Sequence, residues 1–160
     1  AFSMALSTPS VTNLNGDPNM DYIASYNIAT ATWGSLAGGP ASAAAVEEMV
    51  HFNGNLYVAG DMSPTFQVYN IAAGTWSNII VPDANYTFIK SLAVNSSGIM
   101  MVGLDYHSRL YRYDINNGSW SLVMEQTGGQ CESLLYYGSD VYVGMDRFSG
   151  RWEFMGVFIP

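Results

Sequence analysis

Short apolar runs alternate with small polar turns along the whole chain, and this pattern gives the first indication of its fold. Continuous apolar runs of strand length occupy residues 56–59 and 99–102, and each follows a turn that contains Gly54 or Gly98. Asn-Gly and Ser-Gly pairs between apolar runs are typical of β-hairpins. No segment shows the sustained spacing of three and four residues that marks an amphipathic helix. The pattern therefore predicts an all-β protein.

One stretch, residues 41–48, has helical propensity because of its alanines and its two glutamates. It is short and follows Gly38-Gly39-Pro40, so we expect a loop between repeats there. Glu47 and Glu48 are then expected to be solvated.

A phrase of eight residues recurs three times, beginning with tyrosine and ending with tryptophan seven positions later. The three pairs are Tyr26 with Trp33, Tyr69 with Trp76, and Tyr113 with Trp120. A fixed period of forty-odd residues between copies indicates a repeat architecture. A partial fourth copy near the end of the chain gives approximate repeats of 1–40, 41–88, 89–130 and 131–160 in one domain.

Each repeat contains four segments of strand length, of which the third carries the tyrosine and the fourth starts at the tryptophan. The apolar runs are continuous, whereas a sheet with one solvated face would alternate polar and apolar positions. A small sheet stacked between two similar neighbours has this requirement. We therefore expect the tryptophans to be wedged between sheets, each burying on the order of 200 Å².

The unit that runs from residue 56 to Trp76 resembles a kelch repeat, as found in the propeller domain of galactose-oxidase-like proteins. The resemblance implies a β-propeller of four-stranded antiparallel blades. The chain departs from the family at the Gly-Gly doublet after the second strand, which is reduced here to Ala59-Gly60, Val102-Gly103 and Val143-Gly144. About four repeats are present. These are expected to form part of a larger ring or a ring closed by its own termini, or several chains complete one ring or stack laterally.

Composition restricts the partners of the chain. The net charge is −8, and only 11% of the residues are charged. Nucleic acids and anionic membranes require a cationic surface, so neither is an expected partner, and no apolar stretch is long enough for membrane insertion. A surface rich in Ser, Thr, Asn and Gly is typical of secreted or surface-exposed proteins. Three sequons are candidate glycosylation sites, at Asn85, Asn95 and Asn117.

One acidic position recurs in register. Asp61, Asp105 and Asp146 each lie eight residues before an aromatic residue, and Asp17 lies nine before Tyr26. In a propeller this position follows the second strand, so the carboxylates would surround one mouth of the channel and bind a cation or a polar ligand. Alternatively, each aspartate only caps its own turn. Tyr106 and His107 follow Asp105 and are added as candidate ligand contacts.

Few residues of the chain suit catalysis. Cys131 is the only cysteine, and we expect a buried, inert thiol. His51 is expected in a core or an interface, and no histidine has a partner at metal-ligand spacing. The resemblance to galactose-oxidase-like enzymes implies a copper site of tyrosines and histidines, for which this chain has too few histidines. We therefore expect neither a metal, nor a cofactor, nor enzymatic activity.

Three functions remain as hypotheses. The first is a non-catalytic extracellular or virion-surface propeller module that acts as a scaffold for protein partners or self-assembly. The second is a carbohydrate-binding propeller, in which loop aromatics such as Tyr106 stack on sugars beside Asp105 and His107. The third is a fragment of a larger secreted oxidase or hydrolase.

Overall fold

The computed structural model describes residues 23–36, 39, 42–83, 88–105, 109–125, 129–146 and 157–158. Every regular element among these residues is a β-strand, which confirms the all-β prediction. The chain divides into two compact units, Ala1–Gly39 and Pro40–Pro160. The described part of the first unit is a two-stranded antiparallel sheet of β1 (Ala24–Asn27) and β2 (Thr32–Ser35).

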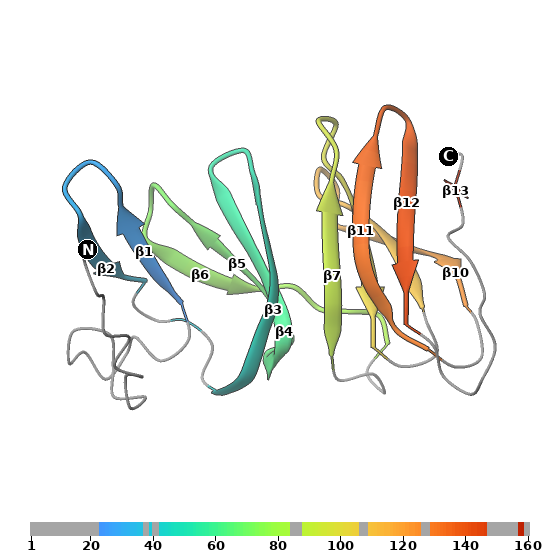
Figure 1. The fold of residues 1–160 in the computed structure, drawn as a ribbon, viewed down its shortest axis with the longest axis horizontal. Coiled ribbons are helices and arrows are strands. Elements are labelled where there is room, and N and C mark those ends of the chain that lie inside the picture. The colour runs from blue at the N-terminus through green and yellow to red at the C-terminus, as the bar shows by residue number, and fades with distance from the viewer. Residues whose placement is uncertain are drawn as a thin grey trace, which may run out of the picture. The chain divides into compact units, whose positions relative to one another are not determined.

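The second unit contains three antiparallel sheets, in which each strand pairs with the next strand in sequence (Figure 1). The β3–β6 sheet consists of β3 (Ser42–Phe52), β4 (Asn55–Ser63), β5 (Phe66–Asn70) and β6 (Thr75–Asn78). The β7–β10 sheet consists of β7 (Ile89–Val94), β8 (Ile99–Leu104), β9 (Leu110–Asp114) and β10 (Ser119–Met124). The β11–β13 sheet consists of β11 (Cys131–Tyr137), β12 (Asp140–Met145) and β13 (Val157–Phe158). The predicted strand order within a repeat is therefore observed.

The recurring tyrosine–tryptophan phrase is a β-hairpin. In each copy the two residues are direct partners on neighbouring antiparallel strands. The ring centroids are 4.9 Å apart in Tyr26–Trp33, 4.9 Å apart in Tyr69–Trp76 and 4.5 Å apart in Tyr113–Trp120. Facing aromatic pairs of this kind stabilise a hairpin beyond the area that they bury. The seven-residue spacing thus reflects the pairing of these two residues across the turn.

The turn of this hairpin is fixed by the residue after the tyrosine. The side chains of Asn27, Asn70 and Asp114 each accept a hydrogen bond from a backbone N–H two or three residues later, at 2.8–3.0 Å. The last turn residue has a positive φ in all three copies: Ala31 at 53°, Gly74 at 66° and Gly118 at 72°. Glycine adopts this conformation without steric cost, whereas alanine does not.

This difference gives a reciprocal prediction for two turns. Gly118→Ala places an alanine in the left-handed conformation and should lower the free energy of unfolding by about 1 kcal/mol. Ala31→Gly removes an alanine from that conformation and should raise the free energy of unfolding by a similar amount. A methyl group on Gly118 would meet no atom within 4 Å, so packing does not contribute to its effect. Urea denaturation of both variants measures the changes. Two changes of the same sign would contradict this explanation.

The expectation of a loop at residues 41–48 is wrong, because β3 begins at Ser42 and continues through this stretch. Most of it pairs with β4, and the register slips between Ala43 and Ala45 and again between Val46 and Glu48. Pairing with a neighbouring strand supplies the backbone hydrogen bonds, and this outweighs the modest helical propensity of alanine and glutamate.

A β-bulge interrupts the first strand of every sheet in the second unit, and a glycine of the second strand lies opposite each bulge. The three glycines are Gly60, Gly103 and Gly144. A methyl group on Gly60 would collide with the carbonyl of Ala45, and one on Gly144 would collide with the hydroxyl of Ser133. Glycine is therefore the residue that this close approach requires.

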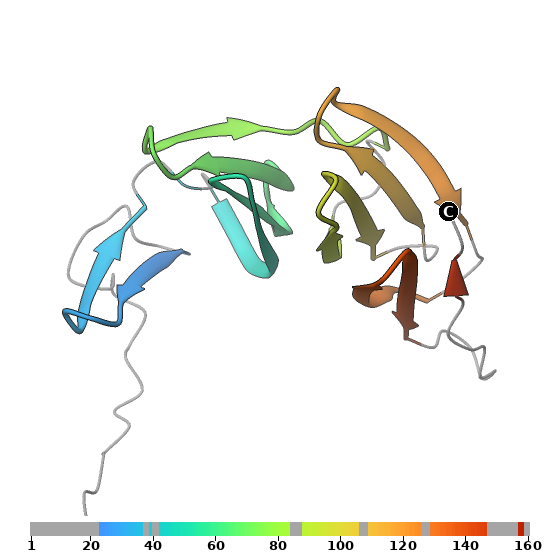
Figure 2. The same cartoon turned by 90° about the horizontal axis from the view of Figure 1, so that it is seen from above.

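The core of the second unit lies between its sheets. One apolar cluster joins the β3–β6 and β7–β10 sheets, and a second joins the β7–β10 and β11–β13 sheets. Consequently β8 is buried on both faces, with Met100 in the first cluster and Met101 in the second. The first strands β3, β7 and β11 lie next to one another, as Figure 2 shows from above. This confirms the prediction from the continuous apolar runs.

The tryptophans differ in burial more than their repetition predicts. Trp120 packs against the first cluster, and its ring lies 6.2 Å from that of Phe66 on the preceding sheet, so it is wedged between sheets as expected. Trp76 is half-buried. Trp33, in the first unit, is 49% exposed.

Candidate functional site

Three charged side chains lie on the first strands of the three sheets in the second unit. Glu47, Lys90 and Glu132 are the extra residues of the bulges in β3, β7 and β11. A bulge changes the direction of its side chain relative to the pleat of the strand. The three strands are neighbours, and Lys90 Nζ lies 3.0 Å from Glu47 Oε1. We call these three residues together with Asp105 the bulge cluster.

The electrostatics of the bulge cluster are centred on Lys90. Its hydrogen bond to Glu47 raises the pKa of the ammonium group despite partial burial, and the charges of Glu47, Glu132 and Asp105 act in the same direction. Lys90 therefore remains protonated at neutral pH. A lysine that acts as a nucleophile or base needs the opposite shift. The bulge cluster can thus link three strands electrostatically or attract a cationic group, but it does not activate an amine.

The structure places the recurring aspartates at corresponding ends of the second strands. Asp105 and Asp146 directly follow β8 and β12, and their backbone N–H groups donate to the carbonyls of Phe88 and Gln130 at 3.1 and 3.0 Å. Asp61 differs, because it lies within β4 opposite Ala45. Of the three, Asp105 is the one whose charge acts on Lys90. The predicted companions Asp17, Tyr106 and His107 lie outside the described residues.

A second charged group lies at one end of the β7–β10 sheet. The Arg109 guanidinium forms ion pairs with Asp83 and with Glu125, the latter at 2.6 Å. The hydroxyl of Tyr111 donates to Asp83 at 3.5 Å. Because Asp83 precedes β7 and Glu125 follows β10, the arginine ties together the two chain segments that enter and leave this sheet.

Cys131 is fully buried at the start of β11, as predicted. Burial, and then the nearby charge of Glu132, raise the pKa of its thiol to about 12. The thiolate is the reactive form of cysteine, so this thiol is inert at neutral pH. Its backbone carbonyl accepts a 2.6 Å hydrogen bond from the buried Ser91 hydroxyl, which connects β11 to β7. The residue therefore has a structural position between sheets.

Two of the predicted glycosylation sites lie in described turns, and both side chains take part in those turns. Asn95 Oδ1 accepts hydrogen bonds from the backbone N–H groups of Ser97 and Ile99. Asn117 Oδ1 accepts one from Ser119, and its Nδ2 donates to Asp114. Asn85 lies outside the described residues. The side chains of Asn95 and Asn117 therefore stabilise their own turns.

Sequence reasoning missed the bulge cluster, although a signal was present. Glu47 and Lys90 are separated by nearly the same period as Lys90 and Glu132, and that period matches the repeat. Glu47 is exposed, as expected, but it is also ion-paired. His51, expected in a core or an interface, is exposed on β3.

The described residues contain no group of three or more His, Cys, Asp or Glu side chains arranged to hold a metal ion. In the same part of the chain, no helix has the length and apolar character needed to cross a bilayer.

Comparisons with known proteins extend the description of the fold. No family model matches the chain, and no curated protein matches it. Two structures of the extracellular domain of one B. thetaiotaomicron protein do match. The first is described as part of a one-component system; its TM-score is 0.63 at 15% identity, and the match covers 79% of this chain and 18% of that one. The second is described as part of a hybrid two-component system; its TM-score is 0.64 at 15% identity, and the match covers 88% of this chain and 20% of that one.

A computationally designed protein, Ika4, matches with a TM-score of 0.52 at 17% identity, over 72% of this chain and 66% of that one. The chain thus spans about a fifth of the length of the two bacterial structures. Similarities at these identities show the fold alone. They agree with the observed architecture, an all-β chain whose four-stranded antiparallel sheets resemble propeller blades.

Proposed function

We propose that this chain is a non-catalytic propeller module that acts as an interaction and assembly scaffold. The observation that carries the proposal is an uncovered apolar face on the β11–β13 sheet. Leu135 and Tyr137 of β11 are 62% and 74% exposed, and Tyr142 beside them on β12 is half-buried. We call these three residues the open face.

The corresponding residues of the β3–β6 sheet are covered. Phe52 and Tyr137 each precede a two-residue turn, and two positions earlier Val50 pairs with Tyr57 just as Leu135 pairs with Tyr142. Tyr57 is 4% exposed, and Val50 and Phe52 pack against the cluster that the β7–β10 sheet completes. The same positions are thus a sheet–sheet interface in one repeat and exposed in another.

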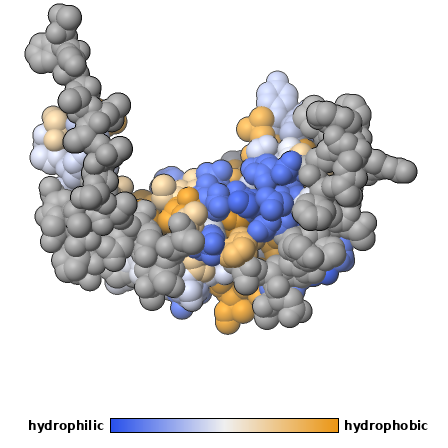
Figure 3. Space-filling model, turned by 60° about the horizontal axis from the view of Figure 1, so that its bottom comes forward, coloured by the Kyte–Doolittle hydropathy of each residue, from blue (hydrophilic) through white to orange (hydrophobic). Residues whose placement is uncertain are grey.

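This comparison also indicates what would cover the open face. In the β3–β6 sheet, Phe66 lies next to the face residues and its ring contacts Tyr113 and Trp120, each at 6.2 Å between centroids. The expected partner is therefore a β-sheet that presents an aromatic tyrosine–tryptophan hairpin. Exposed apolar side chains that lie together on one face, as in the open face, are typical of interaction sites. Figure 3 shows hydrophobic patches beside hydrophilic ones on one face of the described surface.

Substitution of the open face tests the proposal. The chain itself carries sheets with the required hairpin, so we expect concentration-dependent self-association in sedimentation velocity. The double variant Leu135→Asp, Tyr137→Asp should weaken it by about tenfold or more, because each large apolar side chain contributes about 1.5–3 kcal/mol when buried. Leu122→Asp, at a similarly exposed leucine of the β7–β10 sheet, is the matched control. Equal sedimentation of all three proteins at every concentration would refute the proposal.

The state of the reactive side chains supports the absence of catalysis. Cys131 is buried as a neutral thiol, and Lys90 is held as a protonated ion-pair partner. Neither group has the lowered pKa that activates a nucleophile. A scaffold requires only surfaces and turns, and these are the features that recur in the repeats.

Two further parts of the proposal are the repeat class and the location of the chain. The kelch-like phrase in the sequence supports membership of the kelch repeat class. An extracellular location is supported by the composition and by the matches to extracellular domains. Carbohydrate binding is the second candidate function. It depends on Asp105 together with Tyr106 and His107, and the exposed Tyr137 ring offers one further surface for stacking.

A further inference from the structure

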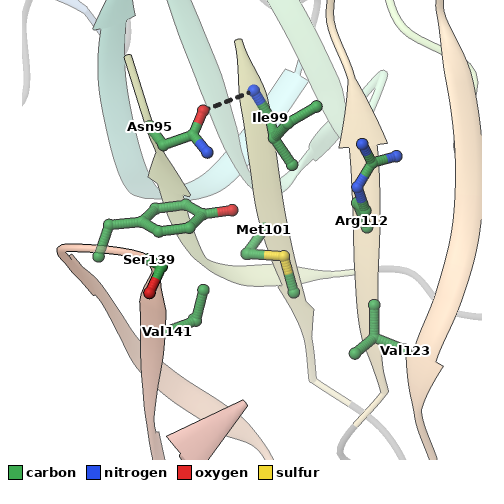
Figure 4. Close-up of a pocket in the computed structure, with 8 residues that line it drawn as sticks. Asn95, Ile99, Met101, Arg112, Val123, Ser139 and Val141 are labelled. Atoms are coloured by element: carbon green, nitrogen blue, oxygen red, sulfur yellow. Dashed lines mark hydrogen bonds between the residues drawn. The ribbon is translucent and has the colours of Figure 1, made fainter. Parts of the chain in front are cut away.

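The β7–β10 and β11–β13 sheets enclose a partly open cavity of about 190 Å³ that the scaffold function does not use. Its walls are apolar: Met101 comes from β8, Val123 from β10 and Val141 from β12. Figure 4 shows these side chains around the cavity, with Asn95 and Arg112 near its other end. Met101 and Val141 each retain only 4% exposure, so the inner wall is well shielded from water.

Three side chains that line the cavity, Asn95, Arg112 and Tyr136, can donate hydrogen bonds. Asn95 uses its carbonyl oxygen for the backbone N–H groups of Ser97 and Ile99, which leaves its Nδ2 as the group available to a ligand. Tyr136 contributes a phenol, whose pKa is raised by burial and lowered by the charge of Arg112. Arg112 of β9 and Tyr136 of β11 line the cavity from facing sheets.

Arg112 supplies a positive charge that its nearest acid satisfies only in part. Its Nη2 lies 3.9 Å from Asp114 Oδ2, which is beyond hydrogen-bond range. The Asp114 carboxylate already accepts hydrogen bonds from the backbone and side chain of Asn116 and from Asn117. The guanidinium has five N–H donors in a planar fork. It can therefore bind a further anion at the cavity.

We propose that this cavity binds a small organic monocarboxylate with an apolar body. The carboxylate would accept from Arg112, with Asn95 Nδ2 and the Tyr136 hydroxyl as further donors. The apolar body would lie against Met101, Val123 and Val141. Ligand pockets for drug-sized molecules measure about 300–1,000 Å³, so the ligand is smaller than these.

The surroundings disfavour other ligand classes. A sugar would place several hydroxyls against an apolar wall without partners, which is costly. A phosphate or another multiply charged anion would be repelled by a chain of net charge −8 and would leave the apolar wall uncovered. A monoanion with an aromatic ring or a short alkyl chain satisfies both parts of the site.

The test is a titration of the intact chain with sodium benzoate, observed through the methyl resonance of Met101 and through the heat of binding. We expect a saturable shift of that resonance. Benzyl alcohol, which keeps the ring but lacks the charge, should bind about tenfold more weakly or worse, and so should benzoate with the Arg112→Gln variant. Arg112 is partly exposed, so this variant is expected to fold.

A pair of substitutions on one strand checks the location. Val123→Phe fills the cavity and should abolish benzoate binding, whereas Leu122→Phe adds the same ring at an exposed neighbour on β10 and should leave it unchanged. Absence of a saturable Met101 shift would overturn the proposal. Equal affinity of wild type and Arg112→Gln would do the same, as would equal loss in the two phenylalanine variants. These readouts do not depend on self-association through the open face.

Discussion

Gly103→Ala is expected to destabilise the second unit by about 3 kcal/mol, within the range that overpacking costs in a close-packed core. The added methyl group would lie 2.5 Å from Cys131 Cβ and 2.5 Å from Ser91 Oγ. Neither neighbour can easily move, because Cys131 lies in a strand of the facing sheet and the Ser91 hydroxyl donates a hydrogen bond to the Cys131 backbone carbonyl. Chemical denaturation at neutral pH measures the loss.

Gly118→Ala is the comparison for this result, since its added methyl group meets only open space. Its expected cost of about 1 kcal/mol reflects backbone conformation alone. If Gly103→Ala costs no more than Gly118→Ala, the close approach of the β7–β10 and β11–β13 sheets at this glycine is not as tight as the structure shows.

Alkaline pH is expected to destabilise the chain through Cys131. The thiol has an ordinary pKa of 9.0, which burial raises to about 12 in the folded state. Below pH 9 the thiol is protonated in both the folded and the unfolded chain, and its contribution to stability is fully present. Between pH 9 and 12 the unfolded chain releases the proton and the folded chain retains it, so stability is lost as the pH rises. The expected loss is about 3 kcal/mol between pH 8 and pH 11.

Comparison with Cys131→Ala isolates this effect. Burial also raises the pKa of Tyr57, Tyr113 and Tyr136, so these phenols add to the alkaline loss in both proteins. Urea denaturation at several pH values should give a shallower decline for the alanine variant, although that variant is somewhat less stable at neutral pH. Parallel declines for the two proteins would show that the thiol does not titrate as its burial requires.

The parts of this fold that the sequence predicts well are those with local causes. The tyrosine–tryptophan hairpin is specified within eight residues, by an aromatic pair, by a capping residue such as Asn70 and by a residue such as Gly74 that tolerates positive φ. The Asn53–Gly54 turn is equally local, with φ positive at both residues as a type I′ turn requires. Such features can be read without knowing which strands become neighbours.

The features that were missed depend on pairing and stacking. The strand at residues 42–48 exists because β4 lies beside it, and Glu47, Lys90 and Glu132 form a group only because a bulge turns each of them in three adjacent strands. Repetition also predicts equal burial for all three tryptophans, but burial depends on which neighbour covers each copy. The same limitation applies to the open face, whose residues are indistinguishable in type from the covered Val50 and Phe52.

The local nature of the hairpin has a consequence for how the chain folds. Each tyrosine–tryptophan pair closes a loop of only a few residues, and hairpins form in about 1–10 μs. The contacts between sheets join residues that are far apart, such as Ser91 with Cys131 and Lys90 with Glu47. Closing these long loops costs more chain entropy and slows folding. We therefore expect the tyrosine–tryptophan hairpins to form first and independently. The first strands β3, β7 and β11 should then pack together in the slow step.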